Sequence, residues 1–336
     1  MAINKRLINT GGEVVIPTSF NTVTYSGSGA TGQNVGGVGF QADLVWIKSR
    51  TASLSNVVHD VLRGQALLIT DSTTAEINNG SNTVVSTSDG FTLQGGDSHT
   101  SVNEAGTNNF VAWCWKAGGA AVTNTDGSIT SEVSANVDAG FSVVKYIGNG
   151  TSGATVGHGL GVEADYMIFK RLNATESWNV WNRAESSKVG FLNLINAFVS
   201  YSILGSTTTN ITLNNGTGHN VSSSPFIAYC FAEKAGFSKF GSYSGSVSDV
   251  SVTTGFEPAF VMVKSFTGAY SWYIIDNKRG ATSPTSNSLF ANLSNGEAGG
   301  YGIYFDSNGF TVSSGVGSGT NSSGNTYIYM AFANQF

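Results

Sequence analysis

The most regular pattern in the chain is an apolar segment of eight residues that occurs three times. The three copies read FVAWCWKA at 110–117, FIAYCFAE at 226–233 and YIYMAFAN at 327–334. Side chains of a β-strand alternate between its two faces, so a strand that is apolar on every residue must be covered on both sides. We therefore predict a fully buried strand at each of these three places.

The two faces of this strand differ in the size of their side chains. In the first copy, Val111, Trp113 and Trp115 share one face, and Phe110, Ala112 and Cys114 share the other. Aromatic side chains suit a face where sheets or units abut, and small ones suit a face that is approached closely. Such a division of large and small side chains is expected of a strand in the middle of a sandwich, where sheets or units abut.

A second block also recurs three times and precedes the apolar segment in each section. It reads GFQADLVWIKSR at 39–50, GVEADYMIFKRL at 161–172 and GFEPAFVMVKSF at 255–266. Lys48, Lys170 and Lys264 fall in register. Glycine-rich turns after Tyr25, Tyr146 and Tyr243 precede the blocks in the same order. Landmarks that recur in a fixed order indicate an internal repeat.

The repeats divide the chain into five parts. We predict an N-terminal docking arm at 1–20, a first repeat at 21–118, a linker at 119–139, a second repeat at 140–236 and a third at 237–336. The linker contains Asp126-Gly127, a hairpin signal. Hardly any linker separates the second and third repeats, so we expect these two to pack tightly and the first to be set apart.

Each repeat shows about seven short strand signals separated by turn residues, and no helical period of any length is present. This pattern predicts an all-β fold of tandem antiparallel β-sandwich repeats, of jelly-roll or lectin-like type. Composition agrees, because 43 glycines and 20 phenylalanines favour turns and strands. Apolar residues make up 40% of the chain, which argues against disorder.

Charge narrows the range of partners. Charged residues make up only 11% of the chain, and its formal net charge is −5. The 16 lysines and arginines form no basic patch, so a nucleic-acid partner is not predicted. No apolar run approaches the ~20 residues that span a bilayer, and no export signal is recognisable, so we expect no membrane insertion.

Candidate chemical groups mostly have a simpler structural interpretation. Cys114 and Cys230 occupy equivalent places, and the third repeat has Ala331 there. We therefore predict buried free thiols rather than a disulfide or a metal pair. Asp60 with Arg63, and Asp276 with Arg279, are interpreted as pairs that tie a turn together. The four histidines share no metal-ligand spacing, so no metal or cofactor is predicted.

Two further motifs were considered as binding sites. GSGATG at 27–32 matches a dinucleotide fingerprint, but no helical pattern follows it, so we expect a loop that connects strands. Tyr270, Trp272 and Tyr301 lie beside glycine turns, where aromatic rings could stack on sugars. These three are our candidate glycan contacts, although core positions at strand starts are commoner.

The segments GFQADLVWIKSR, FVAWCWKAGG, NTDGSITSEVSAN and YCFAEKAGFSKFGSYSGS resemble a repeated domain of tail-fibre-like and other virion surface proteins of marine bacteriophages, notably cyanophages. The resemblance covers about 22–336. It implies a location on the outside of a phage particle, made in the host cytoplasm and released by lysis. It supplies no catalytic residues.

We therefore expect a non-enzymatic virion surface protein, either a fibre-type host-binding protein or a capsid decoration or head-fibre component. The alternative is a virion-borne or secreted glycan-binding or glycan-degrading enzyme, which would need two carboxyls roughly 5–9.5 Å apart in a cleft. A bacterial adhesin is a third possibility. The expected partners are other virion proteins through the arm, host surface glycan, and further copies of the chain, as a trimer if it is a fibre.

Overall fold

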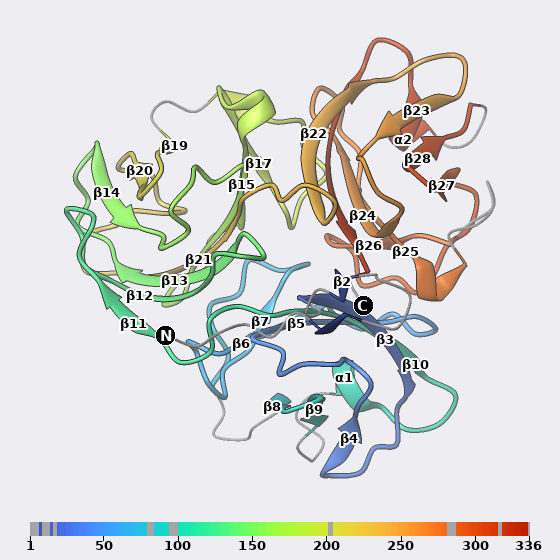
Figure 1. Ribbon diagram of the computed structural model, residues 1–336, viewed down its shortest axis with the longest axis horizontal. Helices are drawn as coiled ribbons and strands as arrows, with labels where there is room; N and C mark the ends of the chain where they lie inside the picture. Colours follow the sequence, from blue (N-terminus) through green and yellow to red (C-terminus); the bar gives the residue numbers. More distant parts are fainter. Residues whose placement is uncertain are drawn as a thin grey trace.

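The structure is a computed structural model, and it describes residues 7–8, 14–15, 19–78, 84–93, 100–200, 204–280, 287–314 and 318–334. The regular secondary structure of the described chain is almost entirely β, and its strand pairs are antiparallel. The prediction of an all-β sandwich fold is confirmed. Figure 1 shows three bodies around a common centre, coloured blue to teal, green to yellow, and orange to red. We call them units one, two and three.

Unit one has a five-stranded and a three-stranded sheet. The larger sheet has the order β3 (Phe20–Ser26), β10 (Asn109–Trp115), β5 (Leu44–Ser49), β6 (Val57–Asp60) and β7 (Leu68–Ile69). The smaller sheet has the order β4 (Gln33–Val35), β9 (Gly90–Leu93) and β8 (Val84–Thr87). The single turn α1 (Thr100–Asn103) precedes β10.

Unit two repeats this order and extends it at both edges. Its larger sheet has the order β11 (Val122–Asn124), β12 (Ser131–Asn136), β13 (Phe141–Ile147), β21 (Pro225–Phe231), β15 (Tyr166–Arg171), β16 (Asn179–Asn182), β17 (Lys188–Phe191) and β18 (Val199–Ser200). The smaller sheet has the order β14 (Ala154–Gly157), β20 (Asn210–Leu213) and β19 (Gly205–Ser206). A 3-10 turn, η1 (Arg183–Glu185), follows β16.

Unit three returns to five and three strands. Its larger sheet has the order β22 (Ser238–Ser244), β29 (Thr326–Ala333), β24 (Pro258–Ser265), β25 (Trp272–Asp276) and β26 (Leu289–Phe290). Its smaller sheet has the order β23 (Val250–Thr253), β28 (Gly309–Val312) and β27 (Ile303–Asp306). Two single turns, η2 (Asn277–Arg279) and α2 (Ser318–Asn321), complete it. No helix in the described residues is long and apolar enough to cross a membrane.

The segment at 119–139 forms a hairpin that belongs to the sheet of unit two. β11 and β12 pair with Asn124 opposite Ser131, and the Asp126-Gly127 turn lies between them. β12 then pairs along its whole length with β13. The segment thus extends the second sheet and is not a free connection.

The three apolar segments are the closing strands β10, β21 and β29, and each lies between two neighbours in its sheet. One face of the first two closing strands packs inside its own sandwich, where Ala112 and Cys114 belong to the core of unit one and Ala228 and Cys230 to that of unit two. The opposite face packs into a core shared by all three units. The pattern of bulky and small side chains thus corresponds to two different buried environments.

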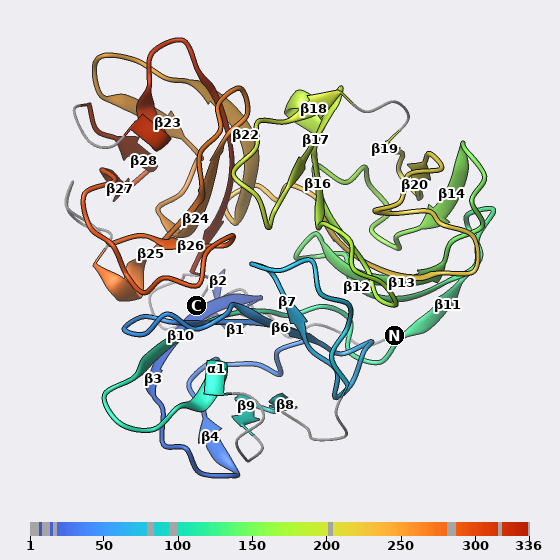
Figure 2. The ribbon, with the colours of Figure 1, turned by 180° about the vertical axis from the view of Figure 1, so that it is seen from behind.

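The shared core brings the last aromatic residues of the closing strands together. The ring centroids of Trp115 and Phe332 lie 5.6 Å apart, those of Phe231 and Phe332 5.7 Å apart, and those of Trp115 and Phe231 6.3 Å apart. Figures 1 and 2 show the three larger sheets around this centre from opposite sides. The expectation that unit one stands apart is wrong, because its tryptophans need cover that only the other two units supply.

An asparagine fixes the glycine-rich loop in each unit. Asn103, Asn220 and Asn321 accept from the backbone N–H groups of Ser28, Asn149 and Ser246, and donate to the carbonyls of Ala30, Thr151 and Ser248. The residue before each asparagine accepts a bond from the tyrosine that precedes the loop, namely Tyr25, Tyr146 or Tyr243. GSGATG is therefore a clamped connection between strands.

Replacing Cys114 or Cys230 with alanine should cost little stability. Both thiols are free and buried, and Ala331 fills the equivalent slot in unit three. Removing one heavy atom should lower the free energy of unfolding by about 1 kcal/mol, whereas Trp113→Ala should lower it by about 3–5 kcal/mol. Urea unfolding of the three variants measures this. A loss above that of Trp113→Ala in either cysteine variant, or an intramolecular bridge found by mass spectrometry, would contradict the prediction.

Candidate functional site at the joints between units

The three repeated lysines each bridge two units. Each side chain is fully buried, and each Nζ donates to a carbonyl of its own unit and to one in the preceding unit of the ring. Across the joints, Lys48 Nζ lies 2.5 Å from Ser294 O, Lys170 Nζ 3.1 Å from Thr73 O, and Lys264 Nζ 3.1 Å from Ile195 O. Unit one thus contacts unit three, unit two contacts unit one, and unit three contacts unit two.

Two more hydrogen bonds recur at each joint with the same direction. Two residues after each lysine, a carbonyl accepts a backbone N–H from the neighbouring unit: Arg50 from Glu297, Leu172 from Glu76, and Phe266 from Phe198, at 2.7, 2.9 and 3.0 Å. A side chain beside the next strand donates across the joint: Asn56 to Phe290 O, Trp178 to Ile69 O, and Trp272 to Phe191 O, each at 2.9 Å. The three joints therefore form a closed, head-to-tail ring with pseudo-threefold symmetry.

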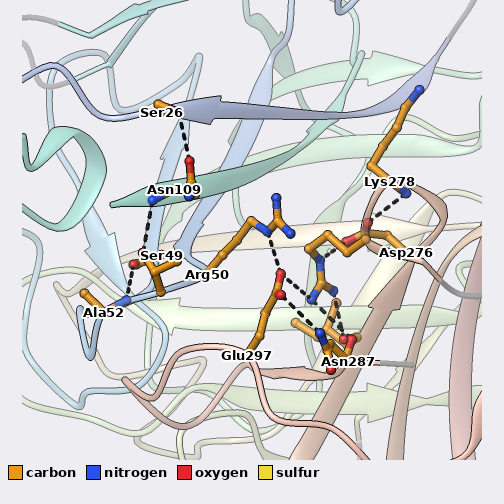
Figure 3. A network of polar contacts seen from close by, with 12 residues as sticks. Ser26, Ser49, Arg50, Ala52, Asn109, Asp276, Lys278, Asn287 and Glu297 are labelled. Atoms are coloured by element: carbon orange, nitrogen blue, oxygen red, sulfur yellow. Dashed lines mark hydrogen bonds and ion pairs between the residues drawn. The ribbon is translucent and has the colours of Figure 1, made fainter. Parts of the chain in front are cut away.

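The joint between units three and one contains a buried chain of charges. Arg279 Nε lies 2.7 Å from Asp276 Oδ2, and the indole N–H of Trp113 donates to the same oxygen at 2.8 Å. Glu297 Oε1 lies 3.5 Å from Arg279 Nη1 and 2.5 Å from Arg50 Nε (Figure 3). Asp276 and Arg279 have side chains with no exposed area. Each of these charges thus has an opposite charge or a donor beside it.

The joint between units one and two has an equivalent arrangement. Arg63 Nε lies 2.5 Å from Asp60 Oδ2, and the Tyr229 hydroxyl donates to that oxygen at 2.7 Å. Glu76 lies 3.5 Å from Arg63. Trp113 and Tyr229 are the fourth residues of their apolar segments, so the same strand position supplies the donor in both joints.

The joint between units two and three has an apolar replacement for this arrangement. Met330 occupies the position of Trp113 and Tyr229, and Asn182 occupies that of the two aspartates. Phe198 replaces the glutamate and packs against Phe266 and Trp272, with centroids 5.0 and 6.0 Å apart. Arg183 pairs with Glu163 and Asp165 of its own unit. The side-chain donor, the aspartate, the arginine and the glutamate of the other two joints are thus all absent from these positions, although Lys264 and Trp272 still donate across this joint.

The buried lysines have strongly perturbed protonation. Desolvation lowers the pKa of Lys264 to about 7 and the pKa values of Lys48 and Lys170 to about 8. Such shifts often mark catalytic groups. Here each ammonium is enclosed by backbone carbonyls, which gives it a structural role in linking two units.

A small cavity lies within the described part of the shared core. It has a volume of about 20 Å³ and is lined by apolar side chains of all three units, including Trp46, Ile168 and Met330. Ligand pockets of proteins measure roughly 300–1,000 Å³. The centre of the ring is therefore a packed junction, with room for about one water molecule and none for a ligand of ordinary size.

The three predicted glycan contacts differ in how exposed they are. Trp272 is 1% exposed, and its indole donates across the joint to Phe191 O, so its face cannot stack on a sugar. Tyr301 is partly exposed and packs against Tyr273 and Phe290. Tyr270 is also partly exposed. Trp272 is therefore corrected to a core residue, since its position at a strand start lies in a joint.

The histidines do not form a site. His59, His158 and His219 are buried, and desolvation lowers their pKa values, to about 4 for His59 and His219. His99 lies outside the described residues. In the part of the chain that the structure describes, no cluster of three or more histidine, cysteine, aspartate or glutamate side chains could hold a metal ion.

The residues of the joints are recognisable in the sequence only when two different units are compared, because each Asp and Arg pair and its donor lie in different units. Unit two lacks the Asp and Arg pair but has Tyr229, and unit three has the pair but lacks a donor at Met330. Each pair belongs with the donor of the next unit in the ring. Shifting the comparison by one unit makes all three joints consistent.

Removing the Tyr229 hydroxyl should destabilise the protein, because Asp60 would lose a donor that water cannot replace. Tyr229→Phe should lower the free energy of unfolding by about 1.5–3 kcal/mol. Tyr329→Phe is a matched control, since Tyr329 is similarly buried but packs its ring against Phe310. Equal losses in the two variants, measured by urea unfolding, would contradict the assigned role.

The lysines should make the protein more stable at pH 9 than at pH 7. The pKa of Lys264 is about 7 in the fold, against 10.5 as its ordinary value, so the unfolded chain binds more protons throughout this window. Stability then rises with pH, by at most about 1.4 kcal/mol per pH unit for one group. Lys264→Met should reduce this rise, whereas Lys239→Met, at the exposed pair with Glu233, should retain it. Identical pH profiles of the unfolding free energy would refute the assignment.

One protein family spans all three units. A family model described as "Domain of unknown function (DUF7483)" matches residues 17–335. No curated protein matches the chain. The matched range begins just before β3 and continues past β29, so it includes every joint. The chain therefore belongs to the DUF7483 domain family over almost its whole length.

Proposed function

We propose that the protein is a non-enzymatic structural protein on the surface of a bacteriophage particle, as a fibre-type host-binding protein or a capsid decoration or head-fibre component. The observation that carries the proposal is the use of the buried charges. Asp60, Arg63, Asp276 and Arg279 all hold units together at the joints. Such an arrangement suits a rigid body whose task is to persist and to present a surface.

The exposed loops also suit this proposal. The glycine-rich loops of units one, two and three present hydroxyl, amide and backbone groups, and an asparagine clamps each of them. Rigid polar loops lose little conformational entropy on binding, and weak contacts at several loops reinforce one another. Host surface glycan is the partner that fits such uncharged polar loops.

The first residues are proposed as the attachment to other virion proteins. β1 (Leu7–Ile8) pairs with β2 (Val14–Val15), so this part of the arm forms a short antiparallel pair with itself. A two-stranded pair has two outer edges whose backbone groups can accept a strand from a neighbouring chain. The rest of 1–18 lies outside the described residues.

Phe20 limits how much of the N-terminal arm can be deleted without damage to the core. It is fully buried, stacks on Phe332 at 5.3 Å and lies 4.9 Å from Trp115, although the sequence placed it in the arm. Ser19 O accepts the N–H of Lys116. A deletion must therefore end before Ser19, or it will damage the core as well as the arm.

A protein that lacks residues 2–17 should fold but should not be incorporated into particles. Particles are assembled with the truncated or the full-length protein, and incorporation is quantified by mass spectrometry. Val247→Ser, which changes an 84% exposed side chain on a loop of unit three, is the control and should be incorporated normally. Normal incorporation of the truncated protein would show that the arm is not the anchor.

Two further experiments test the proposed location and the absence of enzymatic activity. Electron microscopy of intact particles with labelled protein should locate it on the particle surface, and its absence there would overturn the proposal. The purified protein should leave host polysaccharide intact, as judged by the size distribution of the polymer after incubation. Depolymerisation would instead support the glycan-degrading alternative.

A further inference from the structure

The differences between the three joints form a consistent set. Two joints have a donor, an aspartate, an arginine and a glutamate at equivalent positions, as in Tyr229, Asp60, Arg63 and Glu76. The third joint has none of these four groups at those positions. Independent drift would be expected to change single positions, and it would leave buried charges without partners.

Pairing of the wrong units would be costly because of these differences. If the closing strand of unit three docked at unit one, the thioether of Met330 would face Asp60 and could donate no hydrogen bond. A buried carboxylate without its donor loses a charge-assisted bond and keeps its desolvation cost. If unit two docked at its own kind, the Tyr229 hydroxyl would meet Phe198 and the neutral amide of Asn182 in place of the carboxylate of Asp60 that it binds in the native joint.

We infer that Trp113, Tyr229 and Met330, which we call the capping residues, determine which unit each joint accepts, so that the three units close in one cyclic order within a single chain. Specificity of this kind arises from the difference between right and wrong pairings. The chain then supplies by itself the threefold arrangement for which a fibre would otherwise need three copies. This inference rests on the joints and holds whether or not the proposed function is correct.

The joint between units three and one needs this selectivity most. Units one and two, and units two and three, are adjacent in sequence, so their contacts are held at a high effective concentration. Unit three reaches unit one only across unit two, and another copy of unit three could compete for it. This joint has the additional pair of Arg50 with Glu297, three bonds from Asn56, and the Arg279 guanidinium 5.8 Å from the Trp113 ring.

The test exchanges two capping residues without changing composition. In the variant Tyr229→Met with Met330→Tyr, the closing strand of unit three becomes suited to unit one, and that of unit two becomes suited to another unit two. Light scattering after size exclusion should give the wild type a single mass that does not change with concentration, 35.0 kDa for one chain. The exchange variant should form oligomers that increase with concentration, with a 10- to 100-fold smaller folding constant.

A second set of variants decides the matter if the exchange variant fails to fold. Tyr229→Met alone should be destabilised, and adding Asp60→Asn and Arg63→Met should restore part of the loss, because the joint then resembles the apolar one. Adding the same two changes to the wild type should not stabilise it. The inference is overturned by an exchange variant with the stability and the oligomeric state of the wild type, or by a triple variant no more stable than Tyr229→Met.

Discussion

The structure depends on three strands that are apolar on both faces. One face of each larger sheet is covered within its own sandwich, and the opposite face still has to be covered. Tryptophan and phenylalanine side chains of β10, β21 and β29 lie on that opposite face, and exposing them to water would cost free energy. Three such faces can cover one another only if they converge. The contact among Trp115, Phe231 and Phe332 is the centre of that convergence, and every joint surrounds it.

Charged groups that are buried beside such a core must be partnered, and this requirement explains the chemistry of the joints. Each repeated lysine donates to carbonyls of two units. Asp60 and Asp276 each bind an arginine of their own unit and a donor from the next unit. Buried ion pairs add little net stability, but breaking one is costly. The apolar core therefore supplies most of the driving force, and the polar groups decide which surfaces may meet.

Much of the local structure followed from the sequence. The alternation of bulky and small residues in FVAWCWKA predicted a strand with two different buried faces, and Ala331 correctly indicated that Cys114 and Cys230 fill small buried slots. These predictions succeed because the faces of a strand and the volume of a slot depend on neighbouring residues and on equivalent positions in the repeat. Asp126-Gly127 likewise predicted the turn between β11 and β12.

The sequence by itself determined the all-β class, the threefold repeat and the burial of its closing strands, because these depend on periodicity along the chain. Only the tertiary structure decided how the units meet. Linker length suggested a separate first unit, but linker length limits distance and supplies no attraction, whereas the uncovered tryptophans of unit one do. The Tyr229 hydroxyl that donates to Asp60 is 169 residues away in the sequence. Trp272 belongs to a joint because its indole donates to Phe191 O of unit two. Contacts between distant residues depend on closure of the ring, which no local pattern specifies.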